Sequence, residues 1–417
     1  MEFINGGVTA PKGFRASGIC SGIKKNTAKN DLALIMADAL CDAAAVYTTN
    51  RVKAAPVFLT KSHLSNGKAR AILANSGNAN ACAPNGEENA LRACEALSKA
   101  AGIAAEDIII NSTGVIGQPL PIEKIEAAIP LLAEKIKKIS PENKEELLSG
   151  GDEAVLAIMT TDTVKKQAAC TFKLGGAFDV TVGAIAKGSG MIHPNMATML
   201  CFITTDCNIS SGMLQKALSS AARRSFNRVS VDGDTSTNDM TAILASGLAG
   251  NPLIAEENED YKIFAEALEK VCVSLAKRIA ADGEGATKLI TCRVTGAADE
   301  ASAEKLSMSV TSSSLVKTAM TGADANFGRV LCALGYAGAD FDPEAVDISF
   351  ESAAGKIPVC KNGRGLAFDE TLAKEILSRD AITITCDMNQ KDGGFEAETY
   401  GCDLTCDYVK INGDYRS

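Results

Sequence analysis

Hydrophobic and polar residues follow two kinds of pattern along the chain: short apolar runs, typical of strands, and apolar positions three or four residues apart, typical of helices. The two patterns are mixed along the whole length. Short apolar runs predict strands at residues 31–37, 43–49, 69–75, 107–111, 178–186 and 198–205. Apolar residues three or four positions apart predict helices at residues 87–101, 122–139, 211–226 and 260–281. Because these elements do not follow a strict βαβ order, the pattern favours an α+β fold built in several layers.

Length and charge set the broad class of the protein. A chain of 417 residues has room for two or three domains, although no Pro/Ser-rich linker marks a boundary. A net charge of −9 argues against a nucleic-acid partner and against an anionic membrane surface. The sequence has neither an N-terminal export signal nor a run of 18 apolar residues. We therefore expect a cytoplasmic protein that binds no membrane.

Cysteine and histidine usage restricts the chemistry. The 14 cysteines include no C-x-x-C pair, which argues against a zinc ribbon or a redox pair, so we expect buried thiols without disulfides. Only two histidines occur, His63 and His193. This excludes a His-rich metal centre and leaves little room for a Ser-His-Asp triad. We predict no metal site, and any catalysis needs another base.

Three familiar ligand motifs are incomplete. The run at 187–190 (KGSG) is too short for the dinucleotide fingerprint, and no phosphate-binding loop of the GxxxxGK[ST] type occurs. The run at 232–236 (DGDTS) resembles the start of a calcium loop. Thr237 and Ile243, however, stand where that loop needs Gly and Glu. We predict an Asx-rich turn there instead.

The most informative segment is residues 187–206, KGSGMIHPNMATMLCFITTD, in which a two-glycine loop leads to Thr198 and an apolar strand. Alone, a Thr at a strand start is an ordinary β residue. Six further motifs accompany it: KGFRASGICSGIK, NSTGVIGQP, SFNRVSVDGDTSTND, DGEGATKL, LVKTAMTGADANFGRVL and DYVKINGDYRS. Together they resemble the ornithine acetyltransferase family, also called glutamate N-acetyltransferase or the ArgJ type. The resemblance extends over essentially the whole chain.

The resemblance implies a self-processing N-terminal-nucleophile enzyme. Its fold is a layered α/β/β/α sandwich with a smaller C-terminal α/β domain at roughly residues 285–400. Cleavage between Ala197 and Thr198 gives an α chain, 1–197, and a β chain, 198–417, assembled as a dimer of αβ units (a heterotetramer). Cleavage also frees an α-amine on Thr198, whose ordinary pKa of roughly 7.7–8.0 suits a general base near neutral pH. This amine supplies the base that two histidines do not.

The resemblance also assigns the site residues. Thr113 and Gly114 match the oxyanion-hole positions, in what we predict to be a turn with free backbone N–H groups after the buried strand 108–110. Alone, the same residues form an ordinary strand-terminating turn. The positions that match substrate-binding residues are Thr161, Lys187, Thr198, Glu284, Asn412 and Ser417.

Chemistry suggests roles for some of these positions. Lys187 is a suitable cation for an amino-acid carboxylate. Glu284 either holds an ammonium group or assists proton transfer, and the sequence does not separate the two roles. Ser417 stands where many relatives end in Thr and keeps the hydroxyl. A role for the C-terminus requires a docked tail, and apolar Val409 and Ile411 favour a final strand.

The implied activity is a ping-pong transfer of acetyl from N2-acetyl-L-ornithine to L-glutamate, in arginine biosynthesis. It needs no cofactor, and acetyl-CoA is a second acetyl donor in bifunctional members of the family. The partners are small amino-acid substrates and the two chains of the protein itself. Two alternatives stay open: a self-processing amidohydrolase or aminopeptidase with the same nucleophile, and a non-enzymatic binding protein that remains uncut.

Overall fold

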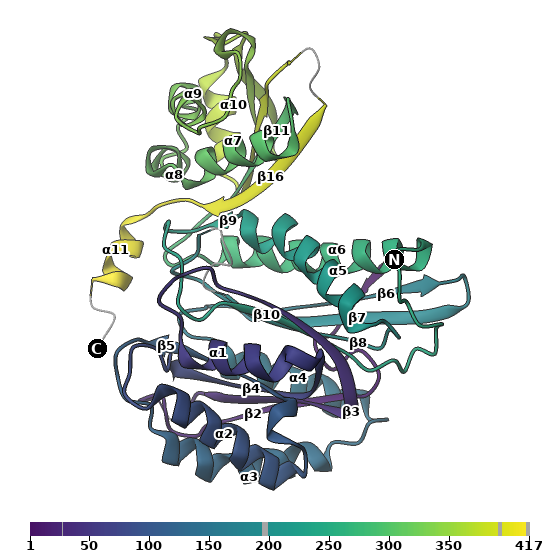
Figure 1. The fold of residues 1–417 in the computed structure, drawn as a ribbon. Helices are drawn as coiled ribbons and strands as arrows, with labels where there is room; N and C mark the ends of the chain where they lie inside the picture. The colour runs from purple at the N-terminus through teal and green to yellow at the C-terminus, as the bar shows by residue number, and fades with distance from the viewer. Residues whose placement is uncertain (27, 194–198, 391–393, 414–417) are drawn as a thin grey trace. The chain divides into compact units, whose positions relative to one another are not determined.

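The computed structural model describes residues 1–26, 28–193, 199–390 and 394–413, and it divides into two compact units, each with its own sheet (Figure 1). The first unit comprises residues 1–188, 195–227 and 235–275. The second comprises residues 189–194, 228–234 and 276–417. Strands and helices are mixed in both units, which confirms the predicted α+β class.

A nine-stranded sheet forms the centre of the first unit, in the order β1-β6-β7-β8-β10-β3-β4-β5, with β2 also paired to β3. The strands are β1 (Glu2–Ile4), β2 (Phe14–Ile19), β3 (Leu32–Tyr47), β4 (Lys68–Asn78), β5 (Ile108–Val115), β6 (Lys166–Leu174), β7 (Phe178–Lys187), β8 (Leu200–Thr205) and β10 (Met240–Ala245). Strand β5 lies at one edge of this sheet.

Strand β3 connects the two halves of the sheet. The sequence predicted two strands here, at 31–37 and 43–49, but the structure has one strand of 16 residues. Its first part pairs with β2 and its last part with β10. It also pairs with β4, and the register of that pairing is irregular between Met36 and Cys41. Side chains from both halves, such as Ile35 and Phe202, share one apolar core.

Helices pack on both halves of this sheet, the β6-β7-β8-β10 half and the β2-β3-β4-β5 half, and α4 (Lys144–Ile158) lies in the core that the two halves share (Figure 1). They are α1 (Ala55–His63), α2 (Gly86–Ala101), α3 (Ile122–Lys138), α4 (Lys144–Ile158), α5 (Ser211–Arg224) and α6 (Glu259–Ala281). Helices α2 and α3 pack on β3, β4 and β5, with Leu34, Leu73 and Leu97 in one core. Helix α6 covers the other half, where the Phe172 and Phe264 rings lie 6.4 Å apart. This arrangement confirms the predicted layered sandwich.

The second unit has a seven-stranded sheet in the order β14-β13-β12-β15-β11-β16-β9. The strands are β9 (Val229–Ser230), β11 (Leu289–Ala297), β12 (Asp347–Ser352), β13 (Gly355–Lys361), β14 (Arg364–Gly365), β15 (Ala381–Asp387) and β16 (Phe395–Cys402). The helices are α7 (Glu300–Ser312), α8 (Ser314–Thr321), α9 (Phe327–Gly335), α10 (Glu370–Leu377) and α11 (Cys406–Asn412). The sheet and helices α7–α10 enclose one apolar core that includes Phe350 and Leu306.

Two sequence expectations concern the whole chain. All 14 cysteines are free, ten of them are buried, and only Cys82, Cys332 and Cys406 are exposed, which confirms that most act as small apolar side chains. Among the described residues, no helix is both long enough and apolar enough to cross a bilayer.

Candidate active site

Thr113 and Gly114 lie inside strand β5, so the predicted strand-terminating turn is wrong. The strand continues to Val115 because Gly114 allows it to stay close to β4. Gly114 has φ +134°, and a Cβ there would collide with the backbone of Gly77, its partner in β4. Beyond this pair the register is irregular at Asn78, which pairs with both Thr113 and Val115.

The open edge of β5 shows which backbone groups face outward. Ile108, Ile110 and Ser112 hydrogen-bond to side chains at this edge. His63 Nδ1 bonds to the Ile108 carbonyl (2.8 Å), and Asn238 Nδ2 donates to the Ser112 carbonyl (2.7 Å). Thr60 Oγ1 donates to the Ile110 carbonyl (2.7 Å) and accepts from the Ile110 amide (2.9 Å). Regular alternation continued from Ser112 would direct the Gly114 N–H to this same edge. The Thr113 hydroxyl, by contrast, has a defined contact, since Lys187 Nζ donates to it at 3.3 Å.

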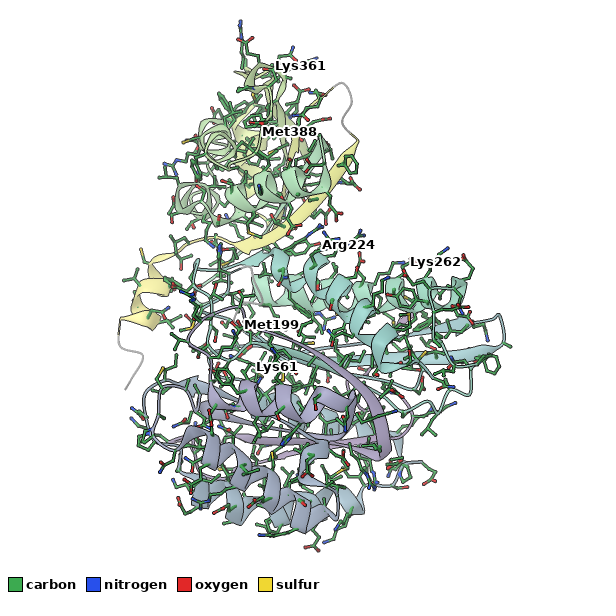
Figure 2. The ribbon with its side chains drawn as sticks, in the orientation of Figure 1. Lys61, Met199, Arg224, Lys262, Lys361 and Met388 are labelled. Carbon is green, nitrogen blue, oxygen red and sulfur yellow. The ribbon has the colours of Figure 1, made fainter. Side chains whose placement is uncertain are left out.

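Lys187 brings a cation to this part of β5. It is the last residue of β7, is 3% exposed, and its Nζ donates to Thr113 Oγ1 at 3.3 Å. In the sheet Lys187 pairs with Leu200 of β8, two residues after Thr198. Met199, the first described residue after Thr198, is labelled in Figure 2. The structure therefore joins two predicted site positions to the start of the β8 strand.

Asp162 organises the surroundings of Lys187. Its carboxylate accepts hydrogen bonds from Gly188 N (2.7 Å), Lys166 Nζ (2.7 Å) and Thr160 N (3.0 Å), and the side chains of Asp162 and Lys166 are fully buried. Burial raises the pKa of Asp162, but the Lys187 and Lys166 cations and the Gly188 amide outweigh burial and lower it to about 2. Thr161, a predicted site position, is thereby fixed beside Asp162.

Lys24 is a further cation of the same unit. Its Nζ donates to the carbonyls of Asn30 and Met159, both at 2.9 Å, and its stem packs on Gly77, the partner of Gly114. Burial lowers the pKa of Lys24 to about 8, against the opposing effect of Asp31. Neither Lys24 nor Asp162 was identified from the sequence, and because residues 159–165 form no helix, the spacing of Asp162 and Lys166 gives no sequence signal for their ion pair.

Glu284 and Asn412 meet in the second unit. Asn412 Nδ2 donates to Glu284 Oε2 at 2.7 Å, and Glu284 is 7% exposed. Two glycines make this contact possible. A Cβ at Gly190 would collide with the Glu284 carboxylate, and a Cβ at Gly285 (φ +71°) would collide with the backbone of Tyr408 in α11.

The expected final strand is wrong, because residues 406–412 form helix α11. Thr405 caps the helix: its Oγ1 accepts from Asp407 N at 3.2 Å and donates to the Gly285 carbonyl at 2.6 Å. Val409 and Ile411 are 68% and 39% exposed, so their alternation does not report a buried strand face. The cap and the Glu284 contact hold Asn412 instead.

Not every predicted position is described. Ala197, Thr198 and Ser417 lie outside the described residues. The predicted Asx turn at 232–236 is confirmed, since the Asp232 carboxylate accepts from the amides of Met191, Ile192 and Asp234.

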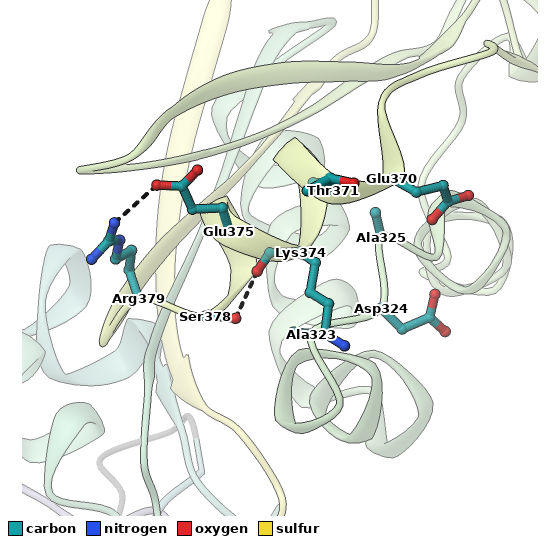
Figure 3. A pocket seen from close by; sticks show the side chains of 10 residues that line it. Ala323, Asp324, Ala325, Glu370, Thr371, Lys374, Glu375, Ser378 and Arg379 are labelled. Carbon is teal, nitrogen blue, oxygen red and sulfur yellow. Dashed lines mark hydrogen bonds and ion pairs between the residues drawn. The ribbon is translucent and has the colours of Figure 1, made fainter.

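A cavity of about 630 Å³ in the second unit contains none of the predicted site residues (Figure 3). Its lining carries both signs of charge, from Asp324, Glu370, Lys374, Glu375 and Arg379, and Glu375 pairs with Arg379 at 3.2 Å.

Comparisons with known proteins cover the whole chain. A family model described as the ArgJ family matches residues 15–417. The arginine biosynthesis bifunctional protein ArgJ of Symbiobacterium thermophilum is 51% identical over 100% of both chains. ArgJ 1 of Clostridium acetobutylicum is 50% identical over 99% of this chain and 98% of its own. The crystal structure of an ArgJ protein from Bacillus halodurans is 45% identical and covers 51% of this chain and 97% of its own, with a TM-score of 0.48.

Proposed function

The chain belongs to the ArgJ family, and on that premise we propose that it transfers the acetyl group of N2-acetyl-L-ornithine to L-glutamate through an ester on Thr198. One observation carries the proposal. Lys187 Nζ donates to Thr113 Oγ1, while Lys187 pairs in the sheet with Leu200, two residues after Thr198. Lys187 and Thr113, which can stabilise a negative oxygen, are therefore linked through the sheet to β8, the strand that follows the proposed nucleophile Thr198.

The first step is cleavage of the chain. Thr198 Oγ attacks the Ala197 carbonyl carbon, the bond from that carbon to the Thr198 nitrogen breaks, and the nitrogen takes the hydroxyl proton. Water then hydrolyses the resulting ester. The products are a carboxylate on Ala197 and a free amine and hydroxyl on Thr198. Chains of 197 and 220 residues result, which we propose remain together as a dimer of αβ units.

The second step is acyl transfer. The Thr198 amine takes the hydroxyl proton as Oγ attacks the acetyl carbonyl, and then gives that proton to the departing α-nitrogen of ornithine. The glutamate amine attacks the acetyl ester in turn and restores the Thr198 hydroxyl. Each attack builds a negative oxygen, which the Gly114 amide and the Thr113 hydroxyl are suited to bind. Because Lys187 donates to the Thr113 oxygen, the hydroxyl hydrogen is free to point at that charge.

Lys187 also suits a substrate carboxylate. Lys24, Lys166 and Lys187 lie around Asp162, and Asp31 is a second carboxylate beside Lys24, so three cations face two carboxylates there. An amino-acid carboxylate bound there would meet a cation that is already desolvated, and electrostatic attraction is strong in such a site.

A transfer assay separates this proposal from the hydrolase alternative. With acetyl-labelled acetylornithine, we expect label in N-acetylglutamate when glutamate is present, and little free acetate when it is absent. Release of acetate that does not respond to glutamate would favour a hydrolase, and an uncut chain with neither product would favour a binding protein. The same assay with acetyl-CoA as the only donor tests the second activity that the resemblance implies.

The Glu284→Gln variant tests substrate binding. We propose that the Glu284 carboxylate accepts a hydrogen bond from the side-chain ammonium of acetylornithine. A hydrogen bond to a charged group contributes about 1.5–3 kcal/mol, so the KM for acetylornithine should rise by a factor of about 10 to 150. The matched control is Glu375→Gln, which removes a paired carboxylate in the separate cavity and should leave KM unchanged. Equal KM values for Glu284→Gln and the wild type would contradict this role.

A further inference from the structure

Four consecutive buried polar residues, Ser236–Asp239, precede strand β10. Their exposed fractions are 4%, 7%, 4% and 0%. A buried polar group is costly unless it is hydrogen-bonded, so such a run needs partners elsewhere in the fold. The partners come from distant segments: Thr48 Oγ1 donates to the Ser236 carbonyl at 2.7 Å, and Ala54 N donates to the Thr237 carbonyl at 3.0 Å.

Asn238 fixes the strand that carries Thr113 and Gly114. Its Nδ2 donates to the carbonyls of Ser112 and Ala79, both at 2.7 Å. The Ser112 carbonyl and the Thr113 amide belong to one planar peptide group. Asn238 therefore sets the direction of that peptide plane, and with it the position of the Gly114 amide that follows.

Asn238 is itself held on two sides. Thr237 Oγ1 donates to Asn238 Oδ1 at 2.6 Å, and Asn111 Nδ2 donates to the Asn238 backbone carbonyl at 3.0 Å. Because Asn111 belongs to β5, the strand and the 236–239 segment hold each other in both directions.

Asp239 fixes the chain immediately after Thr198. Its Oδ1 accepts from Met199 N at 3.0 Å, and this nitrogen belongs to the peptide bond between Thr198 and Met199. Met240 N donates to the Met199 carbonyl at 3.2 Å, so Met199 is held on both sides. Asp239 Oδ2 is buried and has no hydrogen-bond partner among the described residues. Burial raises the pKa of Asp239 well above its ordinary value, which favours a neutral carboxyl group.

We propose that Asn238 and Asp239 form one positioning element, in which Asn238 orients the oxyanion-stabilising strand β5 and Asp239 orients the peptide that follows the nucleophile. Asn238 and Asp239 are adjacent in the chain, so one peptide unit connects the residue that holds the Ser112 carbonyl of β5 to the residue that holds Met199 N. This inference depends on the proposed acetyl transfer and adds two residues to its machinery. Neither residue is assigned to the substrate, so both act through the groups that they hold.

The first test is Asn238→Ala, with Asn251→Ala as the matched control. Asn251 is also a buried asparagine of the first unit, and its Nδ2 donates to the carbonyls of Asn208 and Pro252, away from β5. For Asn238→Ala we expect kcat to fall about 10- to 100-fold with KM for acetylornithine within about threefold, since misplaced catalytic groups affect the transition state. Asn251→Ala should lower the unfolding temperature but leave kcat near the wild-type value. Equal kcat losses in the two variants at equal stability loss would overturn the proposal.

The second test compares Asp239→Asn with Asp239→Ala. An asparagine keeps an oxygen that can accept from Met199 N and matches a neutral carboxyl group in shape, so cleavage at 197/198 should stay within about threefold of the wild-type rate. Alanine removes the acceptor, and cleavage should slow at least about tenfold. If Asp239→Asn is as slow as Asp239→Ala, the carboxyl acts as a proton carrier and positioning is overturned.

The wild-type protein separates this inference from the function that it depends on. A wild-type chain that neither cleaves nor transfers acetyl refutes the proposed function itself. A wild-type chain that does both, alongside an Asn238→Ala variant with unchanged kcat, refutes only the positioning element.

Discussion

The Thr198→Ala variant is expected to remain a single chain of 43.3 kDa and to transfer no acetyl group. Removing the hydroxyl removes both the group that attacks the Ala197 carbonyl and the group that forms the acetyl ester. Without cleavage the α-amine is absent too, so no base of the proposed kind exists. Loss of a catalytic nucleophile lowers kcat by about a thousandfold or more, and intact mass together with the transfer assay measures both effects.

Thr198→Ser is the matched control for this change. Serine keeps the hydroxyl and loses only a methyl group, so we expect slower but complete cleavage and measurable transfer. A Thr198→Ala protein that is still cut at 197/198, or that still forms N-acetylglutamate, would contradict the proposed mechanism.

The Asp162→Asn variant is expected to have the largest effect on stability. Asp162 is fully buried against Lys166 and also accepts from Gly188 N, next to Lys187. The change removes the carboxylate that bonds the buried Lys166 ammonium, and breaking a buried ion pair costs about 3–5 kcal/mol of unfolding free energy. Urea unfolding measures this loss. In the exposed pair of Asp152 with Lys165, the same change at Asp152 should cost less than about 1 kcal/mol.

The pH dependence of stability gives a second readout for Asp162. Its pKa is lowered to about 2 in the folded protein, so its contribution is fully present above the unfolded pKa of about 4. As the pH falls from about 4 through about 2, the unfolding free energy of the wild type should fall by about 2 kcal/mol because Asp162 becomes protonated. The Asp162→Asn variant has no carboxylate at this position and should not show that loss. The gap between the two unfolding free energies should therefore narrow by about 2 kcal/mol in acid. Parallel curves between pH 5 and pH 2 would contradict the assignment.

Periodicity predicted ten elements within the first 281 residues and left most of the second unit without a prediction, and β3 shows why the method fails. Asp38 and Asp42 interrupt the apolar run, which predicts a break between two strands. In the structure Arg15 pairs with Asp38 at 2.6 Å and Lys68 pairs with Asp42 at 3.0 Å, so the strand continues through both. Each cation comes from a neighbouring strand more than 20 positions away, which a local pattern does not reveal.

The same limit explains the residues of the site that the sequence did not identify. Motifs placed Thr113 and Lys187 in the site, and the structure brings them into contact although they are 74 positions apart. Asn238 bonds to Ser112 across 126 positions, and its role depends on the direction of a peptide plane rather than on spacing. Only a folded chain shows such a contact. The sequence motifs proposed residues that would meet substrate, and the structure adds contacts that hold those residues in place.

In the proposed mechanism Thr198 becomes an N-terminal residue and carries the acetyl group. Intact-mass analysis of the purified protein after brief exposure to acetylornithine tests it most directly. We expect two chains divided at 197/198, with the 220-residue chain heavier by one acetyl group on Thr198 and returned to its original mass by glutamate. A single uncut chain that forms N-acetylglutamate, or an acetyl group found on a residue other than Thr198, would contradict it.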